Sequence, residues 1–366
     1  MLSFFEKITD PFLIIAYLVL CFASFALSIL IIIFSKYGFT RRAEMDEMAV
    51  QSAHRGFIPR AGGIAVFVSM ITIIPLSKIF GFNIGEMAWL FATALIVFMI
   101  GVKEDLGYQI RSKTRLLASL LSGSCVILFF NVWLHSVAVP GLDFLLNFSP
   151  FAIAFTLFAT TGVVNGFNLI DGVNGLSSYV SISTALTLSI LAFFTGHFEL
   201  AIFLFLLSGT ILGFFIVNFP FGKIFLGDGG AYLIGHILVW SSIILINFEP
   251  KISPFAILLI FFWPVADTLL SIWRRWKLGN PADRPDRLHF HQLIMRFLEI
   301  RLLGRSRRNI ANPVVTIILI PLVSVPQIIG IIFWQEINAT ICFTVAMSVL
   351  FIFNYGLALN LAKRFR

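Results

Sequence analysis

The sequence predicts an all-α, polytopic integral membrane protein with about 11 transmembrane helices. Three observations carry this prediction: 59% of the 366 residues are hydrophobic, only 12% are charged, and the mean hydropathy is +0.97. These values exceed what the core of a water-soluble protein requires. The apolar runs recur from residue 11 to residue 360 without a polar block large enough to fold separately. We therefore expect a single membrane-embedded domain over residues 1–366.

Each expected helix is an apolar run close to the length of about 20 residues that crosses the hydrocarbon core of a bilayer. The first run is too long and too rich in phenylalanine for a cleaved leader, and no small-residue cleavage pattern follows it, so it should remain as a helix. The runs lie, in chain order, at residues 11–34, 61–80, 87–102, 115–133, 149–164, 176–195, 200–218, 229–247, 252–272, 313–334 and 338–360.

The lysines and arginines predict the orientation of these spans, because positive residues in short loops collect on the cytoplasmic side of a membrane. With the N-terminus outside, all 26 basic residues except Lys7, Lys78 and Lys251 fall in inside segments. An odd number of spans and a cytoplasmic C-terminus follow from this count. The net charge of +8 is then mostly a signal of orientation and of contact with anionic membrane lipids, and we expect no nucleic-acid partner. The expected cytoplasmic loops are 35–60, 103–115, 164–176, 219–229 and 273–312.

Polar motifs gather in these same inside segments. Carboxylates, amides, histidines and cations on one membrane face are what a site for Mg²⁺ and phosphates needs, because hard oxygen atoms bind the ion and cations bind the phosphate oxygens. A transporter or lipid flippase, the alternative with the same composition, would place its polar groups near the bilayer midplane on broken helices. The motifs are HRGFIPRAGG (54–63), GVKEDLGYQIRSKTR (101–115), NGFNLIDGVNGL (165–176), NFPFGKIFLGDGG (218–230) and NPADRPDRLHFHQ (280–292).

Taken singly, each motif also has a purely structural interpretation. Glu104 and Asp105 could be a solvated helix end, and the GDGG at 227–230 could be a tight turn that glycine permits. Asp267 lies within an apolar run, where a carboxylate is either functional or the buried partner of a nearby arginine such as Arg274. The functional interpretation gains weight because all of these motifs converge on one face.

Four motifs in this order, the acidic pair of KEDL, NLIDGVNGL, FLGDGG and DRLHFHQ, resemble the polyprenyl-phosphate N-acetylhexosamine-1-phosphate transferases. Within that family the chain is most similar to the bacterial WecA-like enzymes of glycosyltransferase family 4. The resemblance covers nearly the whole chain. It implies transfer of an N-acetylhexosamine 1-phosphate from a UDP-sugar to undecaprenyl phosphate, with release of UMP, as the first membrane step of O-antigen or other cell-surface polysaccharide synthesis.

The resemblance also implies a cofactor and a location. The cofactor would be Mg²⁺, with Mn²⁺ as a substitute, and its ligands would be Asn168 and Asp228. The protein would lie in the bacterial inner membrane with its active site facing the cytoplasm, and a homodimer is expected because relatives often form one. The donor sugar stays open among GlcNAc, GalNAc, FucNAc and QuiNAc.

Five matches to the family motifs carry catalytic roles. Asp105 is the second acid of an aspartate pair that acts on the lipid phosphate, and Glu104 replaces the first acid of that pair. The residues leave two mechanisms open: direct attack by the lipid phosphate, or prior phosphorylation of Asp105 or Asp171. The expected catalytic residues are Glu104, Asp105, Asp171, Asp228 and His289.

The remaining matches are expected to bind substrate. Phe225 would stack on uracil, with Asn218 beside it, and either Lys113 or Arg115 would contact a phosphate. Asn174 departs from the second aspartate of the commonest bacterial motif, and Gln292 replaces the last histidine of an HxHH signature. The full expected set is Arg60, Lys113, Arg115, Asn168, Asn174, Asn218, Phe225, Arg287 and His291.

Overall fold

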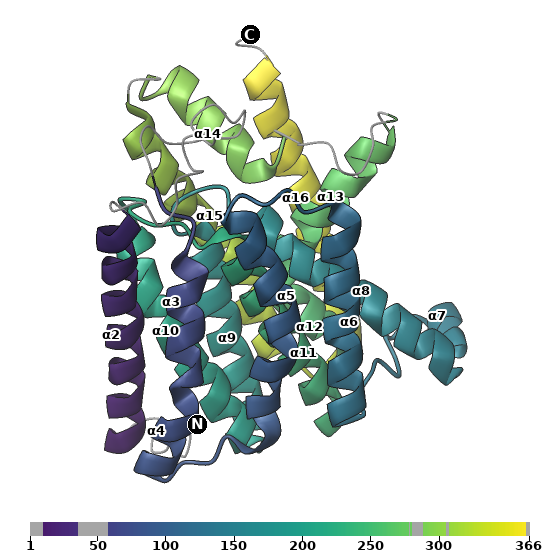
Figure 1. The fold of residues 1–366 in the computed structure, drawn as a ribbon. Coiled ribbons are helices and arrows are strands. Elements are labelled where there is room, and N and C mark those ends of the chain that lie inside the picture. Colours follow the sequence, from purple (N-terminus) through teal and green to yellow (C-terminus); the bar gives the residue numbers. More distant parts are fainter. Residues whose placement is uncertain (1–9, 36–57, 278, 280–287, 305–306, 364–366) are drawn as a thin grey trace.

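The computed structural model describes residues 10–35, 58–277, 279, 288–304 and 307–363, and within these ranges the chain is helical and forms no β-strand. The long helices pack side by side as one bundle (Figure 1). Their bounds are α2 (Pro11–Phe34), α3 (Gly62–Ile71), α4 (Ile73–Phe80), η3 (Gly85–Ala88), α5 (Trp89–Asp105), α6 (Ser112–Phe130), α7 (Pro140–Leu146), α8 (Ser149–Leu169), α9 (Leu176–Phe194), α10 (Phe198–Asn218), α11 (Gly227–Phe248), α12 (Pro254–Ile260), α13 (Phe262–Lys277), α14 (Phe290–Arg301), α15 (Arg308–Ile332) and α16 (Ile337–Lys363).

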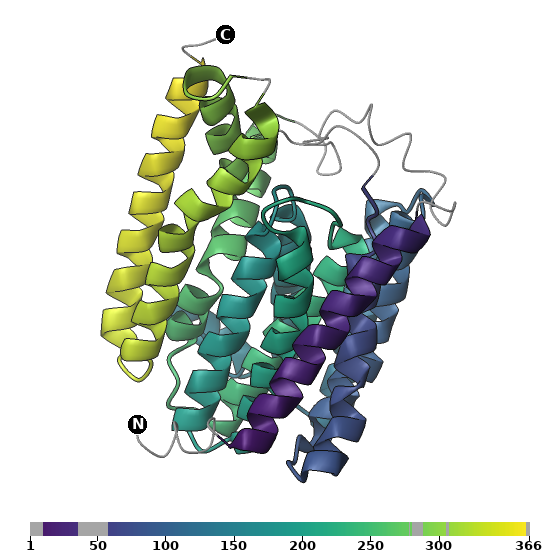
Figure 2. The same ribbon diagram turned by 90° about the vertical axis from the view of Figure 1, so that its left-hand side faces the viewer.

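The predicted number of spans is confirmed. Among the described residues, 10 helical segments are long and apolar enough to cross a bilayer, and the bent pair α12 and α13 makes up to 11. Helix α2 begins at one end of the bundle and α16 ends at the other (Figures 1 and 2), as an odd number of crossings requires. The protein is therefore a multi-pass membrane protein. Which end faces the cytoplasm stays a prediction.

The ninth expected span, residues 252–272, is wrong as a single straight helix. The chain bends by 84° between α12 and α13, and α13 continues to Lys277. Pro264 explains the break, because proline lacks a backbone N–H and its ring clashes with the carbonyl four residues earlier, here that of Ile260.

Several helices extend further into the polar motifs than hydropathy predicts. Helix α5 includes Asp105, α8 continues through Asn168 to Leu169, and α11 begins at Gly227. The expected loops 164–176 and 219–229 therefore shorten to 170–175 and 219–226. Hydropathy ends a helix where polar residues begin, whereas backbone hydrogen bonding continues through them when the bundle surrounds that turn.

Two helices lie in segments that the apolar runs left as loops. Helix α14 occupies part of the expected loop 273–312, and α7 lies in an expected outside loop. Helix α14 is amphipathic and buries one face, which includes Phe290, His291 and Leu293. A helix with so narrow an apolar stripe does not reach the hydropathy of a membrane span.

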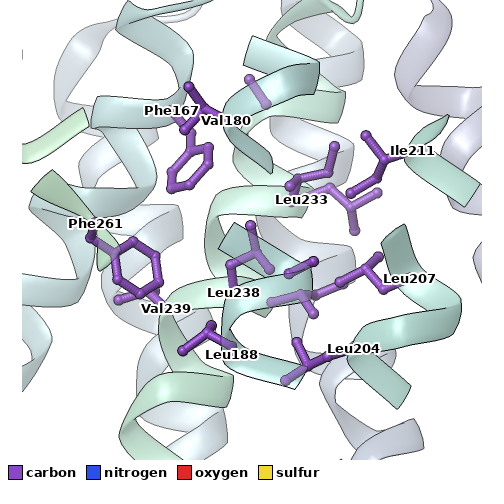
Figure 3. Close-up of a cluster of buried hydrophobic side chains, with 14 of the residues drawn as sticks. Phe167, Val180, Leu188, Leu204, Leu207, Ile211, Leu233, Leu238, Val239 and Phe261 are labelled. Atoms are coloured by element: carbon purple, nitrogen blue, oxygen red, sulfur yellow. The ribbon is translucent and has the colours of Figure 1, made fainter. Parts of the chain in front are cut away.

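Helix α11 is the centre of the bundle. Every residue from Gly227 to Leu245 is buried, and the helix packs against α5, α8, α3 and α9. Figure 3 shows part of this core, where Leu233 and Leu238 of α11 lie among side chains of α8, α9 and α10. The neighbours labelled in that view are Phe167, Val180, Leu188, Leu204, Leu207, Ile211, Val239 and Phe261.

Glycines bring α3, α5 and α11 into backbone contact at the end of the bundle that carries the polar motifs. A Cβ atom added to Gly101 of α5 would lie 2.4 Å from the Cα of Gly229, and one added to Gly63 of α3 would lie 2.4 Å from the Gly230 nitrogen. Any larger residue would separate these helices. Small residues at such positions allow transmembrane helices to approach closely.

Candidate active site

The chain segments before α3 and before α11 are joined by backbone hydrogen bonds. The Phe225 N–H donates to the Pro59 carbonyl at 2.9 Å, and the Gly62 N–H donates to the Phe225 carbonyl at 2.9 Å. Gly227 follows with φ +78°, and a Cβ there would lie 2.6 Å from a carboxylate oxygen of Asp105. Only glycine suits this conformation and this close approach. The turn therefore delivers Arg60 and Asp228 to the last turn of α5.

Asp105 caps the start of α11. Its Oδ1 accepts a hydrogen bond from the Asp228 N–H at 2.8 Å, and its Oδ2 accepts one from the Gly229 N–H at 2.9 Å. A helix N-terminus presents unpaired N–H groups and a positive dipole end, so it is a favourable place for a carboxylate. The Arg60 Nε lies 3.7 Å from the same Oδ1 atom. Both oxygens of Asp105 are thus held in place.

Asp228 receives two further side chains. Its Oδ1 accepts a hydrogen bond from the Asn168 Nδ2 at 2.6 Å and lies 3.3 Å from the Arg60 Nη2. The Arg60 side chain is 39% exposed and therefore reaches from the carboxylates towards solvent. Asp228 therefore joins α11 to Asn168 of α8 and to Arg60, which lies just before α3.

The donor set at Asp228 fits a magnesium ion in part. Among the described residues, no three histidine, cysteine, aspartate or glutamate side chains are grouped as a metal site. Asp228 and Asn168 would supply two oxygen ligands, since half a turn of the amide exchanges its nitrogen for its oxygen. Mg²⁺ commonly uses one or two protein ligands and completes its shell with waters and substrate phosphates. The residues present therefore suit Mg²⁺ bound together with a phosphate substrate.

Asp171 lies in the turn between α8 and α9, beside the same cluster. The pKa of its carboxyl group is raised to about 7, chiefly by burial and also by the negative charge of Asp228, while Arg60 and the Gly227 N–H act to lower it. A carboxyl group with such a pKa can take up and release a proton near neutral pH.

A second cation comes from α6. The Arg115 Nη1 lies 2.9 Å from the Glu104 Oε1, and its Nη2 donates to the Ser112 hydroxyl at 3.0 Å. Lys113 is exposed and forms no ion pair with the residues that the structure describes. Of the two cations that the sequence offered, the structure places Arg115 at the acidic pair. The Tyr232 hydroxyl is also hydrogen-bonded to Arg115. Tyr232 was not among the expected site residues. Its place one turn after Asp228 is the one feature of the sequence that could have indicated it.

The histidines form the other side of the candidate site. The His289 Nδ1 lies 2.7 Å from the Asp267 Oδ2, and the Phe290 N–H donates to the Asp267 Oδ1 at 3.2 Å. The carboxylate of Asp267 thus orients His289. The side-chain partner of Asp267 is therefore this histidine and not Arg274, which donates to the Tyr355 hydroxyl. Asp267 was singled out in the sequence as an intramembrane carboxylate, but its partner was not evident there.

His291 lies against the turn that carries Asp171. A Cβ added to Gly172 would lie 2.4 Å from the His291 Nε2, and the His291 ring stacks on that of His289 at 5.7 Å. Both ring nitrogens of His291 are buried, and neither has a hydrogen-bond partner among the described residues. Burial lowers the pKa of His291 to about 4, so the ring is neutral at pH 7. Its Nε2 atom faces the turn that carries Asp171.

Three expected substrate contacts differ in their surroundings. Phe225 is half-buried at the turn before Gly227. Asn218 is buried with both ends of its amide bonded to backbone groups. Asn174 is buried too, but only its Nδ2 is bonded to the backbone, and its Oδ1 has no hydrogen-bond partner among the described residues. Arg287 lies outside the described residues. The roles of all the site residues stay predictions.

The site can now be compared with known proteins. Residues 87–246 match the family described as glycosyl transferase family 4. The chain is 30% identical over 259 residues to the undecaprenyl-phosphate alpha-N-acetylglucosaminyl 1-phosphate transferase of Escherichia coli O157:H7, a match that covers 69% of each protein. The chain belongs to glycosyl transferase family 4.

Other family 4 relatives lead to the same assignment. The chain is 30% identical over 260 residues to the enzyme of the same name from Yersinia pestis, with 69% of each protein covered. It is 27% identical over 256 residues to the probable undecaprenyl-phosphate N-acetylglucosaminyl 1-phosphate transferase of Bacillus subtilis, with 69% of this chain and 70% of that protein covered. The family predicted from the motifs is confirmed.

The family 4 match spans α5 to α11. It therefore contains Asp105, Asn168, Asp171 and Asp228, the carboxylate and amide side of the site. Arg60 and the two histidines lie outside the matched range. Arg60, just before α3, contacts Asp105 and Asp228, and His291 of α14 lies against Gly172, next to Asp171.

Proposed function

We propose that this family 4 protein transfers an N-acetylhexosamine 1-phosphate from a UDP-sugar to undecaprenyl phosphate and releases UMP. The names of its relatives support the lipid acceptor and the transferred group. The observation that carries the proposal is the meeting of Asn168 and Arg60 on one oxygen of Asp228, whose backbone N–H is held by Asp105. Carboxylates, an amide and a cation within hydrogen-bonding range form a site for a metal-bound diphosphate.

The reaction needs charge neutralisation and alignment, because both substrates are anions. When bound, Mg²⁺ held by Asp228 with Asn168 supplies positive charge to the diphosphate oxygens, and Mn²⁺ would serve in the same way. Arg60 and Arg115 add two fixed positive charges next to the carboxylates. The neutral His291 has one ring N–H that can donate to a phosphate oxygen, and Asp267 holds His289 beside it.

We favour a single displacement. An oxygen of the lipid phosphate attacks the phosphorus that bears the sugar, the bond from that phosphorus to the UMP oxygen breaks, and UMP leaves with the bond's electron pair. Asp105 is a poor nucleophile in this geometry because backbone N–H groups hold both of its oxygens. Asp171, with a pKa of about 7, is placed to accept a proton from the lipid phosphate.

The membrane orientation forms part of the proposal. The site lies at the end of the bundle where α5 ends, α11 begins and α16 ends (Figure 2). Almost all lysines and arginines of the sequence belong to loops at this end in the predicted topology. We infer that this end faces the cytoplasm of a bacterial inner membrane, where UDP-sugars are made. A homodimer is part of the same proposal, by likeness to the family.

Release of UMP tests the proposed function. Purified protein receives undecaprenyl phosphate, Mg²⁺ and one of four donors, the UDP derivatives of GlcNAc, GalNAc, FucNAc and QuiNAc, each with a control that lacks lipid. We expect lipid-dependent UMP release with UDP-GlcNAc, in line with the names of the relatives and with a role in O-antigen or related glycan synthesis. Folded protein that releases no UMP from any donor would instead favour the transporter alternative.

A further inference from the structure

Two side chains of α15 hold the backbone of Asn174. The Asn174 N–H donates to the Asn312 Oδ1 at 2.7 Å, and the Asn174 carbonyl accepts a hydrogen bond from the Thr316 hydroxyl at 2.7 Å. Asn312 is 0% exposed and Thr316 is 1% exposed. Both backbone polar groups of one loop residue are therefore satisfied by a helix that joins the bundle some 140 residues later in the chain.

The same turn is bonded to the loop before Asp228. The Asn174 Nδ2 donates to the Pro220 carbonyl at 2.9 Å, and the Gly175 N–H donates to the Asn218 Oδ1 at 2.7 Å. The Asn218 Nδ2 donates in turn to the Ile224 carbonyl at 2.7 Å. A continuous set of hydrogen bonds thus runs from α15 through turn 170–175 to loop 219–226.

This arrangement gives a physical reason for asparagine at position 174. Its side chain donates to a carbonyl oxygen, and an aspartate there would place a carboxylate oxygen against that carbonyl. Gly222 closes over the same amide, because a Cβ at Gly222 would lie 2.7 Å from the Asn174 Nδ2. The Asn174 Nδ2 is therefore bonded within the protein, and this geometry favours a role for Asn174 in joining turn 170–175 to loop 219–226.

Helix α15 also packs against α14, the helix that carries His291. His291 lies over Gly172, so α15 supports the Asp171 turn on two sides: directly through Asn174, and through α14. Helix α15 lies outside the range of the family 4 match.

We propose that Asn312 and Thr316 are positioning residues: they hold the turn that carries Asp171 in a fixed position relative to Asp228. The activity part of this inference rests on the proposed function, whereas the structural part does not.

Matched substitutions at Thr316 test the structural part. Thr316→Val keeps the shape and removes the hydroxyl, which leaves the Asn174 carbonyl buried and unpaired, whereas Thr316→Ser keeps the donor. Hydrogen–deuterium exchange of a peptide covering residues 170–176 should become about 10-fold faster in Thr316→Val and stay near the wild-type rate in Thr316→Ser. Thr210→Val is the control, because Thr210 is fully buried and its hydroxyl, among the described residues, bonds to the Leu207 carbonyl of its own helix and to nothing else.

A second variant protects the test against misfolding. Asn312→Leu removes the acceptor of the Asn174 N–H at similar side-chain volume, and it should speed exchange in the same peptide. Unchanged exchange in residues 170–176 in both Thr316→Val and Asn312→Leu would overturn the inference.

Kinetics separate positioning from simple stability. We expect kcat for UMP release to fall about 10-fold or more in Thr316→Val, with the KM for the UDP-sugar within about 3-fold of wild type, because the turn places Asp171 and not the nucleotide. Thr316→Ser should restore kcat. A raised KM with kcat retained would overturn the inference and return Asn174 to the nucleotide site. Wild-type protein without UMP release would refute the proposed function. The hydrogen–deuterium exchange measurement would still show whether Asn312 and Thr316 hold turn 170–175.

Discussion

Asp105 holds the backbone of Asp228: its Oδ1 accepts a hydrogen bond from the Asp228 N–H at 2.8 Å, at the first turn of α11. The two carboxylates therefore differ in what they support. Asp105 faces backbone N–H groups, whereas the Asp228 side chain faces Asn168 and Arg60. Removing the Asp105 carboxylate should affect folding and turnover together, whereas removing the Asp228 carboxylate should affect turnover alone.

Alanine at each position tests this difference. Asp228→Ala should abolish lipid-dependent UMP release with little change in thermal unfolding, since the backbone contacts of α11 remain. Asp105→Ala should abolish release and also lower stability by about 1 kcal/mol, the typical effect of losing a helix cap. Glu86→Ala is the control, because Glu86 is exposed and its side chain forms no hydrogen bond or ion pair within the described part of the chain. Full activity in Asp228→Ala would remove the proposed metal and phosphate site.

The ion pair between Glu104 and Arg115 predicts which basic residue of loop 103–115 matters. Arg115→Ala removes a positive charge beside the carboxylates and leaves Glu104 without its partner, so kcat/KM for undecaprenyl phosphate should fall about 100-fold. Lys113→Ala, two residues away and exposed, should retain activity near that of the wild type. Equal losses in the two variants would contradict the assignment.

Phe225 and Phe221 form a matched pair in the loop before α11. Phe225 is the expected uracil platform, and stacking of a base on an aromatic ring contributes about 1–3 kcal/mol. Phe225→Ala should therefore raise the KM for the UDP-sugar by about 5-fold to 150-fold. Phe221 is 73% exposed, and Phe221→Ala should leave that KM unchanged. If Phe225→Ala has a wild-type KM, uracil binds elsewhere.

His291 predicts loss of stability in acid. Burial lowers its folded-state pKa to about 4, below the unfolded value of about 6.5, so the unfolded chain takes up a proton first as pH falls. The stability that the neutral ring provides is fully present above pH 6.5 and decreases between pH 6.5 and pH 4, by up to about 3 kcal/mol. Thermal unfolding at pH 7 and pH 5 should show a larger difference for wild type than for His291→Gln. The same pH dependence in both proteins would contradict this prediction.

Much of the fold follows from local sequence. The apolar runs predict the spans because crossing a bilayer requires a fixed length of apolar helix, and the structure has those helices. Pro264 is visible in the ninth run, but a hydropathy average does not register a lost N–H group, so the bend at α12 and α13 was missed. The amphipathic α14 was missed because averaging cancels its apolar face against its polar one.

The sequence predicts which residues belong to the candidate site, but it does not predict the contacts between them. The carboxylates stand in recognisable motifs, and the structure brings Asp105, Asp171 and Asp228 to one end of the bundle. Contacts between distant segments leave no periodic signal, so neither the role of Tyr232 beside Arg115 nor the bonds from Asn312 to Asn174 could be found. The role of Asn174 in substrate binding stays a prediction, and the sequence does not reveal that Asn312 and Thr316 hold its backbone.

The glycine contacts among α3, α5 and α11 also bear on motion. Backbones that touch at Gly63 and Gly101 cannot slide past one another without atoms overlapping, so these three helix ends move as a rigid body. We expect the backbone that carries Arg60, Asp105 and Asp228 to keep one arrangement whether or not substrates are bound. We expect any closure around the substrates to come from the opposite side, where α14 carries His291 and the 84° bend gives α13 a pivot.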